Sequence, residues 1–267
     1  MSETGEIRES VRVARLESWL ASRQPLVAYS GGVDSTLLAY MAHLHSPSYL
    51  AITVISPLCP SWEASESTRI AREVGFSHRL IEIDPLSNPE VYRNPANRCY
   101  HCKKLMLTEL VEIAGSEGYH PVCDGTNKDD LGAYRPGRRA LEELGVTSPL
   151  AETGLTKDDI RELSRSLGLP TWNKEPMPCL ATRIPYGEAL ERSRLSRIDR
   201  AEESIRSLGF RVVRVRDGGE RAEVEIGEEE IEGADMEELR GKISPRMSEL
   251  GYVSFGISPY RRGRWDR

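Results

Sequence analysis

The sequence contains no long apolar run and no excess of positive charge. No uninterrupted apolar stretch approaches the roughly 20 residues needed to cross a bilayer. The first ten residues, MSETGEIRES, do not contain the apolar segment of an export signal. Acidic residues outnumber basic ones by 42 to 36, which disfavours a general partner of nucleic acids or membrane surfaces. We therefore expect a cytoplasmic protein that binds neither.

Cysteine is also scarce. Five cysteines, an odd number in a chain without an export signal, do not suggest a disulfide framework and direct attention to reactive or metal-binding thiols. RCYHCKK, residues 98–104, is predicted to place Cys99 and Cys102 on a loop that runs into a helix. Basic neighbours and the helix N-terminus would favour their thiolate forms. Taken alone, this CxxC pair also fits a zinc half-site or a redox dithiol.

A third candidate thiol follows in the proline-rich stretch PMPCLATRIPYG. Together with Cys99 and Cys102, Cys179 would form a set of three thiolates. Such a set leaves one iron of a [4Fe–4S] cluster without a protein ligand, whereas most structural zinc sites use four ligands. Cys59 precedes a proline at a strand end and Cys123 lies within an apolar strand, so both are predicted to be buried small hydrophobic residues.

Strands and helices are predicted to alternate through the first 187 residues. The predicted strands cover residues 25–30, 48–56, 77–84 and 121–126, and the predicted helices cover residues 5–23, 35–44, 62–75 and 103–118. A further helix is capped by Thr156, with Asp159 at the third position after it. This order predicts an α/β domain, residues 1–187, in which helices cover both faces of a parallel sheet.

The remaining residues, 188–267, predict a smaller α+β domain with the order αββαβ, for substrate binding or oligomerisation. A turn centred on its Gly-Gly pair would place Arg214 opposite Glu223 and Arg216 opposite Arg221. Arginines that face each other repel unless an anion lies between them, and the alternative is a solvated, charged strand. The candidate ligands of a substrate phosphate are Arg214, Arg216, Thr182 and Arg183.

A polar elbow, SGGVDS, joins the first predicted strand to the next helix. Its glycines permit a tight turn that brings backbone N–H groups close to a ligand, and the helix N-terminus adds partial positive charge. The elbow matches neither GxxxxGK[ST], whose lysine it lacks, nor GxGxxG. Serine hydroxyls can bind phosphate, and Asp34 could hold Mg²⁺. The predicted anion site comprises Ser30, Gly31, Gly32, Val33, Asp34 and Ser35.

SGGVDS after a strand resembles the signature of the PP-loop ATP pyrophosphatases. That resemblance implies cleavage of ATP between the α and β phosphates, adenylation of a substrate oxygen and release of pyrophosphate. DGTNKDD, residues 124–130, is similar to the second motif of the superfamily. Asp124, Thr126 and Asn127 would lie at the carboxyl ends of the strands, where open α/β sheets bind ligands. Lys103 or Lys104 could neutralise phosphate charge.

RCYHCKK, CLATRIPYGE and the paired arginines of RVVRVRDGGERAEVEIG look like the LarE family of ATP-dependent sulfur transferases, over nearly the whole chain. The resemblance implies adenylation of pyridinium-3,5-biscarboxylic acid mononucleotide and conversion of its carboxylates to thiocarboxylates. The product serves assembly of the nickel-pincer nucleotide cofactor of lactate racemase. Further implications are the cofactors ATP and Mg²⁺, a homohexamer, possible contacts with other proteins of the pathway, and Glu202 and Glu225 near the substrate.

The family has two sources of sulfur. In one, a single cysteine at the position of Cys179 gives up its own sulfur; in the other, three cysteines hold a [4Fe–4S] cluster. All three positions are cysteine here, so the resemblance implies the cluster-bearing form, with Cys99, Cys102 and Cys179 as iron ligands. The immediate sulfur donor is not indicated.

Three other interpretations remain open from the sequence. A tRNA thiolase would ordinarily present a wide basic surface, which an acidic chain does not promise. An amidating synthetase of the NAD or GMP type needs ammonia, and the chain shows no glutaminase domain. A non-catalytic adenine-nucleotide-binding protein with a structural zinc would contain neither iron nor acid-labile sulfide.

Overall fold

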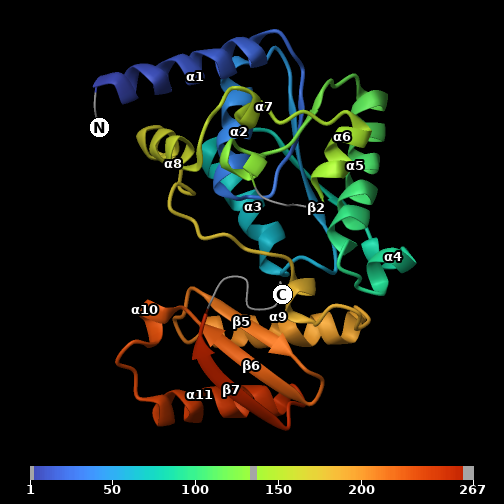
Figure 1. The fold of residues 1–267 in the computed structure, drawn as a ribbon, viewed down its shortest axis with the longest axis vertical. Coiled ribbons are helices and arrows are strands. Elements are labelled where there is room, and N and C mark those ends of the chain that lie inside the picture. Colours follow the sequence, from blue (N-terminus) through green and yellow to red (C-terminus); the bar gives the residue numbers. More distant parts are fainter. Residues whose placement is uncertain (1–2, 133–136, 261–267) are drawn as a thin grey trace. The chain divides into compact units, whose positions relative to one another are not determined.

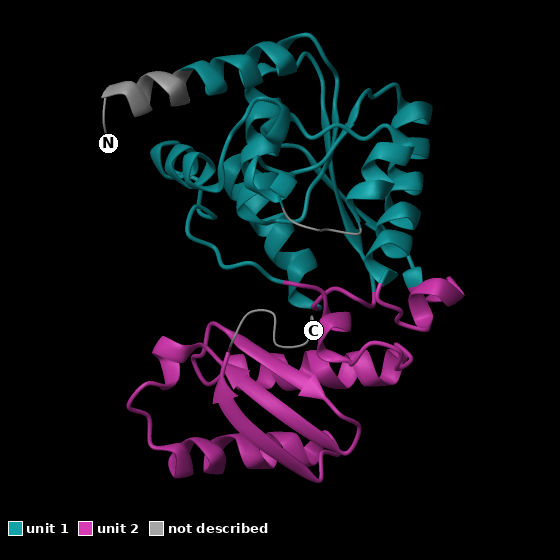
Figure 2. Ribbon diagram, viewed as in Figure 1, with its two compact units in different colours: residues 1–56, 61–85, 97–177 teal, residues 57–60, 86–96, 178–267 magenta. Residues whose placement is uncertain are grey.

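The computed structural model describes residues 3–132 and 137–260, which form two compact units (Figure 2). Unit 1 comprises residues 1–56, 61–85 and 97–177, and unit 2 comprises residues 57–60, 86–96 and 178–267. The main boundary therefore lies ten residues before the predicted one, and two segments from the first half of the chain join unit 2. None of the helices in these described ranges is both long and apolar enough to span a membrane.

Backbone hydrogen bonds explain why those two segments belong to unit 2. The N–H of Leu180 donates to the carbonyl of Leu58 at 2.8 Å. Gly187 donates to Asn94, and Leu190 donates to Tyr92, each at 2.8 Å. Such long-range pairings are not visible in a local pattern of apolar residues, and so the sequence indicated a single boundary.

Unit 1 is built on a four-stranded sheet with the order β3-β2-β1-β4, of which β2 is labelled in Figure 1. Its strands are β1 (Leu26–Ala28), β2 (Leu50–Ile55), β3 (His78–Glu82) and β4 (Val122–Cys123). All three pairings are parallel, which confirms the predicted α/β class. β1 is an interior strand, between β2 and β4. The elbow that follows β1 therefore lies in the middle of the row formed by the carboxyl ends of the strands.

Helices cover both faces of this sheet, as predicted. They are α1 (Glu3–Ala21), α2 (Val33–His45), α3 (Trp62–Val74), α5 (Arg98–Glu117), α6 (Arg138–Leu144), α7 (Pro149–Glu152) and α8 (Lys157–Ser166), with a 3-10 turn η2 (Asp129–Gly132). Neighbouring residues of β1 point to opposite faces. Val27 packs with Leu16 and Leu37 in one core, and Leu26 packs with Leu107 and Leu110 in the other.

The start of α8 confirms its predicted cap. The Thr156 hydroxyl accepts a hydrogen bond from the N–H of Asp159, and the Asp159 carboxylate accepts one from the N–H of Thr156. This reciprocal pair satisfies donors that the first turn of a helix leaves without partners. The helix therefore begins at Lys157, a position that matters for the site below.

Unit 2 contains a three-stranded sheet with the order β5-β6-β7. Its elements are α4 (Pro89–Tyr92), the 3-10 turn η3 (Leu180–Arg183), α9 (Arg192–Arg206), β5 (Val213–Asp217), β6 (Arg221–Ile226), α10 (Glu228–Ile231), α11 (Met236–Glu249) and β7 (Ser254–Pro259). The short turn η1 (Pro85–Ser87) lies where the chain passes from unit 1 to unit 2. The predicted order αββαβ is present, with α10 inserted as one extra turn.

The register of the β5–β6 hairpin differs from the prediction. Arg214 lies opposite Glu225, and Arg216 lies opposite Glu223, so no arginine faces Arg221 in this pair of strands. The turn is one residue later than predicted, because the N–H of Gly218 donates to the carbonyl of Arg221. Moving a hairpin turn by one residue moves every cross-strand pair by two. The prediction based on facing arginines is therefore wrong.

Candidate functional site

The SGGVDS elbow lies between β1 and α2, as predicted. Gly31 has a φ of +70°, and a Cβ there would lie 3.3 Å from the Cβ of Ser67, so both the conformation and the space favour glycine. Gly32 is the N-cap of α2 and offers no side chain to the first turn. The first N–H groups of α2 therefore have no side-chain cap from Gly32, and such groups at a helix N-terminus can bind an anion.

The two serines of the elbow lie side by side. Their hydroxyl oxygens are 3.0 Å apart, and the N–H of Ser30 donates to the Ser35 hydroxyl at 3.1 Å. The Ser35 hydroxyl also contacts the carbonyl of Gly32 at 3.3 Å. These bonds fold the elbow into a small loop whose hydroxyl groups supplement the helix N-terminus as donors.

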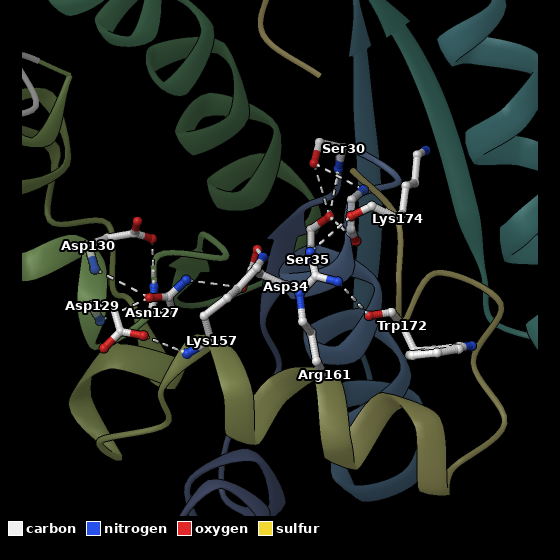
Figure 3. A network of polar contacts seen from close by, with 11 residues as sticks. Ser30, Asp34, Ser35, Asn127, Asp129, Asp130, Lys157, Arg161, Trp172 and Lys174 are labelled. Atoms are coloured by element: carbon white, nitrogen blue, oxygen red, sulfur yellow. Dashed lines mark hydrogen bonds and ion pairs between the residues drawn. The ribbon is translucent and has the colours of Figure 1, made fainter. Parts of the chain in front are cut away.

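Asp34 is the centre of a polar network at the start of α2 (Figure 3). Its Oδ1 accepts a hydrogen bond from Asn127 Nδ2 at 3.1 Å, and its Oδ2 accepts one from Lys157 Nζ at 2.5 Å. The Asn127 side-chain oxygen in turn accepts from the N–H groups of Asp129 and Asp130. Asp34 thus has the ammonium group of Lys157 at one carboxylate oxygen and the amide of Asn127 at the other.

Asp124 forms a second polar cluster directly after β4. Its carboxylate accepts from Lys103 Nζ at 2.9 Å, from the Thr126 hydroxyl at 2.7 Å and from the Ser148 hydroxyl at 2.7 Å. Burial opposes the charged form, but Lys103 and these hydroxyl donors outweigh it and lower the pKa of Asp124. The carboxylate is therefore ionised, and it holds Lys103 at the carboxyl end of the sheet.

The two clusters meet at Gly125. A Cβ on this glycine would lie 3.1 Å from the N of Ser35 and 3.3 Å from the Cβ of Asp34. The short distances favour glycine where the chain after β4 approaches the start of α2. The structure therefore brings the predicted residues of SGGVDS and DGTNKDD together, as parallel neighbouring strands require.

Lys103 and Lys104, predicted as alternatives, point to different partners. Lys103 contacts Asp124, whereas Lys104 donates to Glu143 of α6 at 2.7 Å and to the Tyr100 hydroxyl at 3.1 Å. Hydrogen bonds from Lys104 and Tyr100 hold the pKa of Glu143 at about 2. Successive helical residues diverge by about 100°, so only Lys103 reaches the Asp124 cluster.

Sequence reasoning missed three contributors to this region. Lys157 begins α8, Ser148 precedes α7 and Lys174 donates to the carbonyl of Gly31 at 2.9 Å. The capping box at Thr156 was a usable signal that Lys157 lies in a first turn. The capping box did not indicate that the first turn of α8 would lie beside Asp34.

Cys99 and Cys102 lie on a helix, not on a loop, because α5 begins at Arg98. Residues at i and i+3 share one face of a helix. Neither cysteine is in a disulfide; Cys99 is exposed and Cys102 is half-buried. Cys99 Sγ lies 3.6 Å from Arg98 Nη2, and Cys102 Sγ lies 4.0 Å from Met106 Sδ. The helix therefore places the thiols of Cys99 and Cys102 on the same face.

The other cysteines differ in their surroundings. Cys123 is buried, as predicted; burial raises the pKa of its thiol to about 12. Cys59 is half-buried in unit 2 and not fully buried as expected. Within residues 3–132 and 137–260, no three or more His, Cys, Asp or Glu side chains are grouped so that they could hold a metal ion.

Cys179 belongs to unit 2, where it precedes η3. Its carbonyl accepts hydrogen bonds from the N–H of Thr182 at 3.1 Å, from the Thr182 hydroxyl at 2.9 Å and from Arg183 Nη1 at 3.2 Å. Arg183 Nη1 also donates to the carbonyl of Pro178 at 2.8 Å. Thr182 and Arg183 therefore hold the backbone that carries Cys179, a role that differs from the predicted phosphate contact.

Arg183 and Glu202 form a buried ion pair. Arg183 Nε and Nη2 donate to the two Glu202 carboxylate oxygens at 2.7 Å and 3.0 Å, and the side chains are 0% and 3% exposed. Glu202 also accepts from the N–H of Val215, on the open edge of β5, at 2.9 Å. One carboxylate of α9 thereby connects the Cys179 loop to the sheet.

Arg214 and Arg216 lie on the same face of the sheet, next to this pair. Arg216 donates to Glu225 at 2.8 Å and to the carbonyl of Thr182 at 2.8 Å. Burial, and then the charge of Arg183, lower the pKa of Arg214 to about 10. These three arginines and the two glutamates thus form a buried charged cluster, although its pairs are not those predicted.

Glu202→Gln should lower the free energy of unfolding by about 3 kcal/mol, because removing one charge of a buried ion pair leaves the other uncompensated. Urea denaturation of the variant and of the wild-type protein would measure the difference. Glu203→Gln, which changes an exposed carboxylate one residue along the same helix, should cost less than about 0.5 kcal/mol. Equal losses in the two variants would contradict the structural role of Glu202.

The parallel sheet, the elbow at the start of α2 and the adjoining second motif define a PP-loop protein of the ATP pyrophosphatase type. Comparison with family models gives no match. Related curated proteins agree with this class. The chain is 28% identical to one component of the glutamine-hydrolysing GMP synthase of Methanococcus maripaludis, over 67% of this chain and 61% of that protein.

The chain belongs to the LarE family of ATP-dependent sulfurtransferases. It is 34% identical over 244 residues to the pyridinium-3,5-bisthiocarboxylic acid mononucleotide synthase of Lactiplantibacillus plantarum, over 90% of this chain and 88% of the relative. It is also 39% identical over 245 residues to an uncharacterised protein of Synechocystis sp., over 91% of each chain. The coverage includes both units.

Proposed function

We propose that this enzyme adenylates a carboxylate of pyridinium-3,5-biscarboxylic acid mononucleotide and converts it to a thiocarboxylate, for assembly of a nickel-pincer nucleotide. The observation that carries the proposal is the polar network of unit 1. A charged Asp34, paired with Lys157, lies at the first turn of α2 beside the hydroxyls of Ser30 and Ser35. This arrangement supplies the groups that bind and neutralise a pyrophosphate.

The first half of the reaction makes the carboxyl carbon reactive. A carboxylate is a poor electrophile because its leaving group would be oxide. Attack of a carboxylate oxygen on the α-phosphorus of ATP forms an acyl-phosphate bond and breaks the α–β bridge, so that pyrophosphate leaves. The elbow would hold the departing phosphates, while Lys157 and Lys103 would neutralise the charge that develops on them.

Asp34 is the residue that would hold Mg²⁺ during this step. Its carboxylate is 22% exposed and already carries an ammonium group, Lys157 Nζ, at one oxygen. Because a cation is accommodated at that position, the donor chemistry fits a hard divalent ion. Mg²⁺ at Asp34 would free Lys157 to contact phosphate oxygens. Asn127 would keep the carboxylate in place through its other oxygen.

The second half of the reaction needs a sulfur nucleophile that attacks the acyl carbon and expels AMP. Cys99, Cys102 and Cys179 are not in disulfides, and the first two share one helical face. Three thiols match, in number and type, the protein ligands of a [4Fe–4S] cluster with one open iron, although in the described residues they are not grouped as a metal site. Such a cluster would supply sulfide at the iron that has no protein ligand. Arg183 and Thr182 would fix the backbone at Cys179 for this purpose.

The buried arginine cluster of unit 2 is the proposed site for the anionic nucleotide substrate. Arg183, Arg214 and Arg216 bring three buried guanidinium groups together in this cluster, beside Glu202 and Glu225. Arginine suits such recognition because its guanidinium group binds phosphate and carboxylate oxygens in pairs. Glu202 and Glu225 would act here by orienting the arginines.

The proposal is tested by incubating anaerobically purified protein with ATP, Mg²⁺, sulfide and the biscarboxylate mononucleotide. Mass spectrometry of the small molecules should reveal AMP, pyrophosphate and a product in which sulfur replaces a carboxylate oxygen. The mass of the protein in the same sample separates the two sulfur sources, since a sacrificed cysteine lowers it by one hydrogen sulfide. AMP without any sulfur-containing product would contradict the proposed function.

A further inference from the structure

Lys174 reaches the SGGVDS elbow from a distant part of the sequence. The elbow lacks the lysine that GxxxxGK[ST] loops place beside phosphate. Lys174, eight residues beyond the end of α8, donates from its Nζ to the carbonyl of Gly31 at 2.9 Å. The same ammonium group donates to the carboxylate of Glu66 on α3. It therefore connects α3 to the backbone of the elbow.

The backbone of Lys174 is itself held in place. Its N–H donates to the carbonyl of Thr171 at 2.9 Å. Arg161 of α8 donates to the carbonyls of Trp172 and Lys174, both at 3.3 Å (Figure 3). The side chain is 21% exposed, and its ammonium group lies 5.7 Å from the centre of the Trp62 ring. A lysine restrained at both its backbone and its tip is poorly placed to swing freely toward a ligand.

The contact with Gly31 has a consequence for the next N–H group. The carbonyl of Gly31 and the N–H of Gly32 belong to one planar trans peptide group and point in opposite directions. The carbonyl faces Lys174, and the N–H faces the Ser30 hydroxyl, whose oxygen is 3.4 Å from the nitrogen. The Gly32 N–H is thus turned toward the two serine hydroxyls, on the side where the anion is proposed to bind.

A peptide group between two glycines rotates easily, because neither residue has a Cβ to restrict it. If this group turned over, a carbonyl oxygen would face the phosphates in place of an N–H donor. Attraction would then become repulsion. A charge-assisted hydrogen bond to the carbonyl favours one of the two orientations.

We propose that Lys174 is a positioning residue that orients the Gly31–Gly32 peptide for phosphate binding, and that Glu66 holds Lys174 in this role. The inference rests on the proposed function, because it takes the phosphates of ATP as the ligand of the elbow. Lys174 acts on them through the N–H of Gly32 and not by direct contact. In GxxxxGK[ST] loops a lysine contacts phosphate directly, whereas Lys174 would act by orienting the backbone of the elbow.

The test compares Lys174→Met with the wild-type full-length protein. Calorimetry with Mg²⁺ present should give dissociation constants for ATP and for inorganic pyrophosphate that are about tenfold higher in the variant, the usual cost of a hydrogen bond to a charged group. In protein labelled with ¹⁵N-glycine, the amide resonance of Gly32, assigned through Gly32→Ala, should shift in the ligand-free variant. Lys174→Arg should restore both readouts in part, since it keeps a charged donor.

Two further variants test the role of Glu66 and control for the loss of a lysine elsewhere on the protein. Glu66→Gln keeps a hydrogen-bond acceptor but removes the charge that holds Lys174, and it should weaken ATP binding by about threefold. Lys242→Met removes a lysine from an exposed pair with Glu238 and should change neither readout. A melting temperature for each variant identifies any that fail to fold.

Each result bears on a different claim. If the wild-type protein binds neither ATP nor pyrophosphate, the proposed function itself fails. If the wild-type protein binds them and Lys174→Met binds equally well, the positioning role fails and the proposed function stands. Weaker binding by Lys174→Met with an unmoved Gly32 resonance would also overturn the positioning role, because it would indicate direct contact between Lys174 and the phosphates.

Discussion

Asp34→Asn is expected to reduce substrate-dependent AMP formation by about 1000-fold, the upper range for loss of one preorganised electrostatic contact. Asparagine retains the shape of the side chain and can still bond Asn127. It cannot balance the charge of Lys157, whose Nζ lies 2.5 Å from Asp34 Oδ2, and it is a much weaker Mg²⁺ ligand than a carboxylate. Chromatography of AMP after a single turnover would measure the loss.

The iron and acid-labile sulfide content of the same variant should be unchanged, because Asp34 contributes no thiol. Asp158→Asn is the matched control. It removes the same charge from an exposed position in the first turn of α8, one residue after Lys157. We expect AMP formation by this control within about twofold of wild type. Unchanged adenylation by Asp34→Asn would refute the role of Asp34 as the magnesium ligand.

Cys179→Ala is expected to abolish the thiocarboxylate product while ATP consumption continues. Its adenylated substrate would find no sulfur nucleophile and would return to the carboxylate by hydrolysis, so AMP and pyrophosphate should still accumulate. Mass spectrometry of the small molecules reports both effects in one sample. Continued formation of thiocarboxylate by this variant would overturn the assignment of Cys179 to sulfur delivery.

Variants of the remaining cysteines separate the two sulfur sources. If three thiols hold a cluster, Cys99→Ala and Cys102→Ala should also lose iron and product. If Cys179 alone gives up its sulfur, both variants should keep one turnover. Cys123→Ala is the control, because burial raises the pKa of that thiol to about 12 and keeps it unreactive. It should retain wild-type product formation.

Local patterns predicted the architecture of unit 1 well. The strand at residues 25–30 and the helix after it are present as β1 and α2, with the elbow between them. The parallel pairing followed from strands that alternate with helices, since a parallel connection needs a crossover of about a dozen residues. The cap at Thr156 was confirmed because it depends only on residues within one helical turn.

The sequence predictions were wrong where a shift of one residue changes which residues pair, or where the start of a helix was misplaced. The hairpin turn at Gly219 and Glu220, one position later than predicted, replaced the pairing of Arg216 and Arg221 with that of Arg216 and Glu223. Cys99 and Cys102 were predicted on a loop that runs into a helix, yet α5 already begins at Arg98. Composition does not reveal how far a helix extends toward its N-terminus.

By itself, the sequence determined the class of the protein, the place of its SGGVDS elbow between a strand and a helix, and the identity of its candidate thiols. Those features follow from residue types and short spacings, which act over one turn or one strand. Only the tertiary structure decided that Lys157 pairs with Asp34, that Lys174 holds the Gly31 carbonyl and that Arg183 is occupied by Glu202. These contacts join residues 19 to 143 positions apart. They depend on how helices, strands and loops pack together, which the spacing of apolar residues along the sequence does not indicate.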